Sequence, residues 1–91
     1  MSHRRDAMQC VEEFAKKHLH KILYRMGRNS TVSLWWKNNL VRNFRLQVDR
    51  IAYEIQDEEV LMWWDYLITD DWHLLFEYCV GDELIEEMRG D

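Results

Sequence analysis

The stretch that decides the fold runs from residue 40 to residue 55 and reads LVRNFRLQVDRIAYEI. Parts of it alternate apolar and polar residues, as half-buried strands do. At helical spacing, however, seven apolar side chains share an arc of about 120°, and only Leu46 and Tyr53 fall outside it. We therefore predict a helix from about residue 32 to residue 56. Its apolar face consists of Leu40, Val41, Phe44, Val48, Ile51, Ala52 and Ile55.

A second long amphipathic helix is predicted over residues 4–26. Gly27 follows it, as glycine often follows a helix end, and Ser2 or Asp6 could cap its start. A turn over residues 28–31 would let the two long helices pair as an antiparallel hairpin. The apolar face of the earlier helix consists of Ala7, Val11, Phe14, Ala15, His18, Leu19, Ile22 and Met26.

Shorter helices are predicted in the last third of the chain. Residues 57–59 place three acids where a helix N-terminus favours negative charge, and residues 60–68 are apolar almost throughout. Residues 69–71 can cap a further helix, which Gly81 ends, and Asp82 can cap a last short turn. That further helix carries a stripe of Trp72, Leu75, Phe76, Cys79 and Val80.

The predicted fold class is thus all-α. We expect a small helical bundle in which two long N-terminal helices are packed by two or three shorter C-terminal helices. Residues 1–91 are expected to form one helical domain, because 47% of the residues are hydrophobic and 13% are aromatic. This composition supplies enough apolar surface for one core.

The cellular setting is predicted from what the sequence lacks. It contains no uncharged apolar stretch of about 18 residues, and no apolar run follows the basic residues near the N-terminus. We expect a cytoplasmic, or host-cell intracellular, protein that does not associate with a membrane. Cys10 and Cys79 are expected to be buried reduced thiols, whereas secretion would allow one disulfide between them.

Charge is divided unevenly along the chain. Residues 1–50 contain eleven Lys and Arg against four acids, a net charge of +7. Residues 51–91 contain thirteen acids against Arg89 alone, a net charge of −12. Three interpretations stay open: the halves neutralise each other within the fold, the acidic half docks on a basic protein surface, or the basic half binds phosphates.

Residue patterns typical of catalysis are absent from the sequence. It has no Gly-rich phosphate loop, Gly-x-Ser-x-Gly elbow or His-Glu-x-x-His pair. His18 and His20 would project about 200° apart on a helix, so they cannot bind one metal ion together. Asp70 and Asp71 lie near His73, but an Asp before a helix is first of all a cap. We predict a non-enzymatic protein with no metal and no cofactor.

The best candidates for binding lie in the acidic, aromatic C-terminal half. We predict a protein–protein interaction module that engages a larger protein partner as a small regulator or inhibitor. Phage-encoded host-takeover or anti-defence proteins are often of this kind, and nucleic-acid mimicry is one way of acting. Met62 and Tyr66 could also form a homodimer seam, and Trp63 and Trp64 are expected to fill the core. The candidate partner-binding residues are Glu58, Glu59, Met62, Asp65, Tyr66, Asp70 and Asp71.

The alternative function is nucleic-acid binding. The outer faces of the two long N-terminal helices are basic, and parallel basic helices can follow a phosphate backbone. The overall charge of −5 argues against it. The residues in question are Lys16, Lys17, Lys21, Arg25, Arg42 and Arg45.

Overall fold

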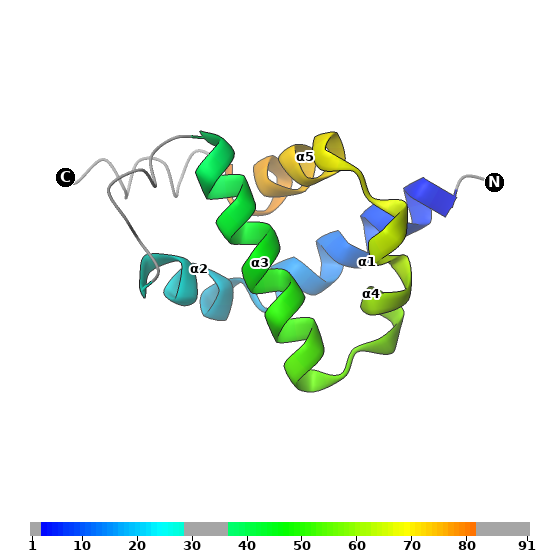
Figure 1. Ribbon diagram of the computed structural model, residues 1–91, viewed down its shortest axis with the longest axis horizontal. Helices are drawn as coiled ribbons and strands as arrows, with labels where there is room; N and C mark the ends of the chain where they lie inside the picture. The colour runs from blue at the N-terminus through cyan, green and yellow to red at the C-terminus, as the bar shows by residue number, and fades with distance from the viewer. Residues whose placement is uncertain (1–2, 29–36, 82–91) are drawn as a thin grey trace.

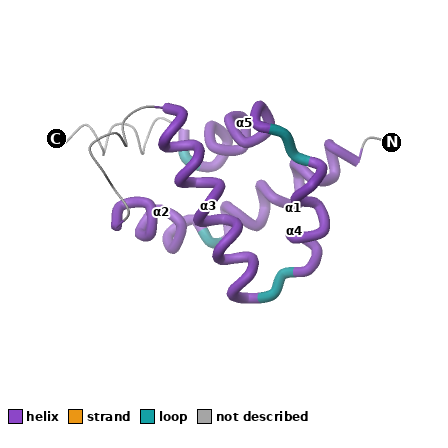
Figure 2. Tube along the Cα trace, in the orientation of Figure 1, coloured by secondary structure: helices purple, strands orange, loops and turns teal. Residues whose placement is uncertain are grey.

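The elements that the structure describes are all helical. The computed structural model describes residues 3–28 and 37–81, and short loops join the helices without any strand in these two ranges (Figure 2). This confirms the predicted all-α class and the choice of helix over strand for residues 40–55. In chain order the elements are α1 (His3–Lys17), α2 (Leu19–Arg28), α3 (Lys37–Ile55), α4 (Glu58–Trp63), the 3-10 helix η1 (Trp64–Tyr66) and α5 (Thr69–Cys79).

The predicted single helix over residues 4–26 is wrong, because the chain turns at His18. The break is local: the His18 N–H still donates to Phe14 O at 3.1 Å and the Ile22 N–H to His18 O at 3.0 Å, both at the α-helical spacing of four residues. Beyond it α2 leaves the line of α1 (Figure 1). α2 packs on α3, whereas α1 packs on α4 and α5. One straight helix could not serve both sets of neighbours, so the predicted long hairpin is replaced by the pairing of α2 with α3.

The ends of α1 and α2 also differ from the predicted ones. Asp6 lies inside the first turn of α1 and does not precede the helix. Gly27 lies within α2, which ends at Arg28. Ser2, the other predicted cap, lies outside the described residues, as does the predicted start of the next helix at residues 32–36.

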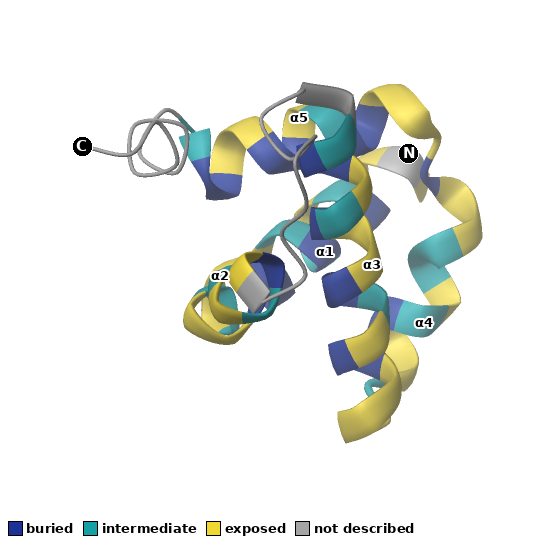
Figure 3. Ribbon diagram, turned by 60° about the vertical axis from the view of Figure 1, so that its left-hand side comes forward, coloured by how far each residue is buried: buried dark blue, intermediate teal, exposed yellow. Residues whose placement is uncertain are grey.

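The inner face of α3 is the centre of the core. Six of the seven apolar residues predicted for it are buried, and Ile55, the last residue of the helix, is 46% exposed. Figure 3 shows this buried stripe turned toward the other helices. The Phe44 ring lies edge-on to Trp72 and Phe76, with ring centroids 6.3 and 5.6 Å away. The predicted stripe of α5 is confirmed, since all five of its residues are buried.

Polar side chains complete the contact between α2 and α3. The Asn43 Nδ2 donates to Met26 O at 3.2 Å, in the last turn of α2. The Gln47 Nε2 donates in turn to Asn43 Oδ1 at 2.9 Å, although Gln47 is buried. This chain of amides fixes the end of α2 against the middle of α3.

The apolar stretch at residues 60–68, predicted as helical, is helical only as far as Tyr66. α4 passes into the tighter η1, and the backbone is then extended at Leu67 and Ile68. Asp71 Oδ2 accepts the Ile68 N–H at 3.0 Å, which starts α5 after this break. Leu67 is consequently buried while Ile68 is 54% exposed.

Two further terminus predictions are confirmed. Asp57 is the N-cap of α4, because its Oδ1 accepts the Val60 N–H at 3.2 Å. Gly81 follows α5 with a φ of 57°, the left-handed conformation that glycine adopts without strain. The last predicted turn, from Asp82, lies outside the described residues.

The central position of Phe44 predicts a large loss of stability when its ring is removed. Phe44→Ala should lower the free energy of unfolding by about 3–5 kcal/mol, because it removes a fully buried ring and leaves a cavity. Leu46→Ala, two residues away on the outer side of α3, should cost less than about 1 kcal/mol. Urea unfolding followed by circular dichroism measures both, and equal losses would contradict the central role of Phe44.

Candidate functional site

Exposed apolar and acidic side chains gather along α4, η1 and the start of α5. Met62, Tyr66 and Ile68 are 57%, 47% and 54% exposed, and exposed residues follow one another along the outer edge of these elements (Figure 3). We call this region the acidic–aromatic surface. It consists of Glu58, Glu59, Met62, Asp65, Tyr66, Ile68 and Asp70, all of which are exposed.

The local structure explains why these side chains point outward. Val60 is buried where α4 packs on α1 and α3, so Glu58 and Met62 lie on the opposite side of this short helix, and Glu59 lies between the two sides, next to α1. The extended backbone after η1 alternates its side chains, which turns Leu67 inward and Ile68 outward.

Asp71 is the one predicted partner-binding residue that is not at the surface. It is only 1% exposed, and its carboxylate accepts the Ile68 N–H. Its role is therefore to start α5. The other six predicted residues are exposed and belong to neighbouring elements, α4, η1 and α5.

Trp63 and Trp64 are only partly buried, so they fill the core less completely than predicted. Their rings have different neighbours. Trp64 contacts Trp72, with centroids 4.6 Å apart. Trp63 contacts Tyr66 at 5.2 Å, and the His3 ring lies 6.0 Å from Trp63 and 5.7 Å from Tyr66. We call His3, Trp63 and Tyr66 the ring cluster.

Sequence reasoning missed His3 as a member of this cluster. It is exposed in the first turn of α1 and meets residues sixty positions further along the chain. The helical pattern of residues 4–26 predicts which side of α1 is apolar, but it carries no signal for which later helix that side meets. Only the packing of α1 against α4 and η1 brings the three rings together.

The acidic–aromatic surface keeps most of its negative charge. Residues 57–71 include six acids and no Lys or Arg. Glu59 accepts a hydrogen bond from Cys10 Sγ at 3.4 Å. Among the residues that the structure describes, the side chains of Glu58, Asp65 and Asp70 make no ion pair or hydrogen bond. Their charge is therefore available to a partner.

A basic residue of the first half of the chain pairs with an acidic residue of the second half outside this surface. The Arg25 guanidinium donates to both carboxylate oxygens of Glu54 at 2.6 and 2.8 Å. These hydrogen bonds lower the pKa of Glu54. The pair therefore stabilises the fold at neutral pH, and this contribution is lost as the pH falls through the lowered pKa. Because the pair is largely exposed, its contribution is small.

Three of the six residues of the nucleic-acid alternative have partners within the chain. Lys16 pairs with Glu12 at 2.8 Å and Arg25 with Glu54. The Arg45 guanidinium lies over the Trp64 and Trp72 rings, 5.9 and 5.6 Å from their centroids. Glu54, which binds Arg25, is nine residues after Arg45 and therefore lies on the opposite side of α3. Arg25 and Arg45 are thus on different sides of this helix. The exposed residues that remain are Lys17, Lys21 and Arg42.

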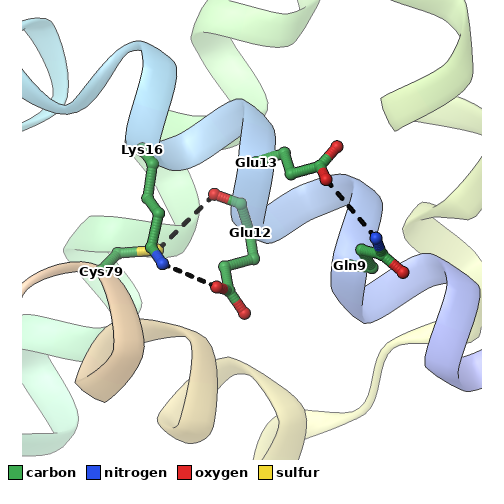
Figure 4. A network of polar contacts seen from close by, with 5 residues as sticks. All are labelled: Gln9, Glu12, Glu13, Lys16 and Cys79. Atoms are coloured by element: carbon green, nitrogen blue, oxygen red, sulfur yellow. Dashed lines mark hydrogen bonds and ion pairs between the residues drawn. The ribbon is translucent and has the colours of Figure 1, made fainter.

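An open groove between α1 and α5, which the sequence did not indicate, has a volume of about 470 Å³. Close to it, the Lys16 ammonium pairs with the Glu12 carboxylate, and Cys79 Sγ lies 3.9 Å from Glu12 O (Figure 4). Acidic, basic and apolar side chains all line the groove, so its composition does not indicate one class of ligand. The lining residues are Arg5, Met8, Gln9, Glu12, Asp71, Leu74 and Tyr78.

The described residues contain neither a metal-binding group of side chains nor a membrane-spanning helix. Within residues 3–28 and 37–81, no three His, Cys, Asp or Glu side chains are grouped so as to hold a metal ion. No helix in these ranges is both long and apolar enough to cross a membrane.

His18 packs its ring on Phe14, with centroids 4.5 Å apart, and burial lowers its pKa.

Comparison with known proteins adds no relative. The chain matches no protein-family model, no curated protein and no solved structure. Its function is therefore inferred from the chemistry of its own surface.

Both cysteines are free thiols, as predicted. Cys79 is buried, whereas Cys10 is only partly buried. Burial, followed by the hydrogen bond to Glu59, raises the pKa of Cys10 to about 12. Burial and the Glu12 carboxylate raise the pKa of Cys79 to about 11. Since the thiolate is the nucleophile, both cysteines should react slowly.

Thiol modification at pH 8 tests these pKa values. With Ellman's reagent, the folded protein should react roughly a hundredfold or more slowly than the chain unfolded in urea. Glu59→Gln should accelerate the reaction of Cys10, because removing the carboxylate lowers the thiol pKa. Glu58→Gln is the matched control and should leave the rate unchanged. Equal acceleration by both variants would contradict a specific contact between Cys10 and Glu59.

Proposed function

We propose that this protein is a non-enzymatic interaction module that binds a larger protein through its acidic–aromatic surface. The observation that carries the proposal is the exposure of Met62, Tyr66 and Ile68 beside three carboxylates without partners, those of Glu58, Asp65 and Asp70. Large apolar side chains grouped within a charged rim have the composition of a protein interface.

The chemistry of the surface favours a basic partner. Carboxylates around an apolar centre attract a positively charged protein surface and accelerate its association. They disfavour a homodimer through the same region, because a two-fold axis would place like charges opposite one another. A protein that masks a basic site on its partner would act as a regulator or inhibitor. Masking a nucleic-acid-binding site in this way would be mimicry of nucleic acid.

Nucleic-acid binding is the weaker proposal. It would rely on Lys17, Lys21 and Arg42, since Lys16 and Arg25 pair with carboxylates and Arg45 lies over two indole rings. Three cations provide fewer phosphate contacts than the six expected from the sequence.

Affinity capture with two matched variants separates these functions. One variant removes three negative charges, Glu58→Gln/Asp65→Asn/Asp70→Asn, and the other removes three positive charges, Lys17→Gln/Lys21→Gln/Arg42→Gln. Each immobilised protein is incubated with lysate of the source cell, with and without nuclease treatment, at low and at high salt. We expect the unmodified chain and the second variant to retain the same protein at low salt. The first variant should retain it at least about tenfold less, a loss of ~1.4 kcal/mol.

Circular dichroism should show equal helicity for all three proteins, which ensures that the comparison concerns the surface alone. Undiminished capture by the first variant would refute the proposal. Capture that nuclease treatment abolishes, and that only the second variant loses, would instead establish nucleic-acid binding.

A further inference from the structure

We propose that the seam between α1 and α4 binds an arginine side chain of the partner, with the guanidinium in contact with the Trp63 and Tyr66 rings and paired with the carboxylates of Asp6 and Glu59. This inference rests on the proposed function, because it names the residue type that the acidic–aromatic surface recognises. It adds Asp6, His3 and Trp63 to the residues that the sequence indicated.

The rings provide the first part of this site. Trp63 and Tyr66 meet nearly edge to face, with centroids 5.2 Å apart and an interplanar angle of 62°. Tyr66 is 47% exposed and Trp63 is partly exposed. The face of an indole or phenol ring attracts a cation placed within about 6 Å of its centroid. His3 completes the cluster on the α1 side of the seam.

Carboxylates from both helices provide the second part. Glu59 lies one helical turn before Trp63, and it reaches across the seam to Cys10. Asp6 is exposed on α1, one turn after His3 and one turn before Cys10. Arg5 lines the groove toward α5 instead. Among the side chains that the structure describes, no Lys or Arg lies over Trp63 or Tyr66.

The neighbouring tryptophan shows how such a site is occupied within this molecule. Arg45 places its guanidinium 5.9 Å from the Trp64 centroid and 5.6 Å from that of Trp72. Trp63 and Trp64 are adjacent in sequence, but their rings have different partners. Trp63 contacts Tyr66, and Trp64 contacts Trp72. The cation over Trp64 comes from α3. We infer that the cation over Trp63 comes from the partner.

Arginine fits this geometry better than lysine. Its planar guanidinium stacks on aromatic rings and donates a fork of hydrogen bonds to carboxylates, whereas the lysine ammonium is a compact, strongly hydrated charge. The seam presents rings and carboxylates together, so it should distinguish the two residues even though both carry one positive charge.

A short peptide tests this site without any knowledge of the partner. The full chain, labelled with ¹⁵N, is titrated with acetyl-Gly-Arg-Gly-amide and with the corresponding lysine and citrulline peptides. The indole N–H signal of Trp63, identified from the Trp63→Phe variant, reports binding. We expect the arginine peptide to shift this signal and leave that of buried Trp72 in place. The lysine peptide should bind at least about threefold more weakly, and the uncharged citrulline peptide should not bind.

Variants locate the site. Tyr66→Leu, and separately Glu59→Gln, should each weaken binding of the arginine peptide at least about threefold. Tyr53→Leu is the matched control, because Tyr53 is 70% exposed on α3 and lies in no ring pair of the described residues. Its affinity should equal that of the unmodified chain.

The outcomes separate this inference from the proposed function. A Trp63 signal that the arginine peptide leaves unmoved, or equal binding of the lysine peptide, would overturn the inference. The proposed function would survive that result if the Glu58/Asp65/Asp70 variant still lost its partner. Conversely, peptide binding combined with undiminished capture by that variant would refute the proposed function and leave the arginine site in place.

Discussion

The packing of Phe44 against Trp72 and Phe76 is the constraint on which the rest of the structure depends. These rings join α3 to α5, and the buried arc of α3 is wide enough to contact α2 and α4 as well. Because α2 packs on one side of α3, α1 cannot run in a straight line with α2 and still contact α4 and α5. The turn at His18 is the local consequence of this division. A ten-residue helix such as α2 is held by its packing on α3 more than by its own propensity.

The same packing produces the candidate site. α4 is short and is held by Val60 on one side only, which leaves its acidic and methionine-bearing side exposed. Cross-neutralisation of the two halves is seen at Arg25 and Glu54, at a distance from this surface. α2, which carries Arg25, and the acidic α4 lie at opposite sides of the molecule in Figure 1.

Sequence periodicity predicted most of the helices and most of the core, because a wide apolar arc such as that of residues 40–55 fits no other regular structure. It failed where tertiary contacts decide: at His18, where the apolar pattern continues across a turn, and at Leu67, where a capping bond to Asp71 ends the apolar stretch. For the candidate site, too, periodicity predicted some features and tertiary contacts decided others. Exposure of Met62 and Tyr66 was predictable from the lack of space in a small core. Burial of Asp71 and the approach of His3 to Trp63 depend on contacts between distant segments.

The central claim, that the acidic–aromatic surface is the interface, is tested most directly by placing a photo-crosslinker at single positions. Met62 and Leu46 are both exposed apolar residues, at 57% and 43%, and only Met62 belongs to this surface. Benzoylphenylalanine at Met62, irradiated in source-cell lysate, should give a discrete protein adduct that disappears when Glu58, Asp65 and Asp70 are neutralised. The same group at Leu46 should give none. Identical adducts from both positions, or an adduct from Leu46 alone, would contradict the account.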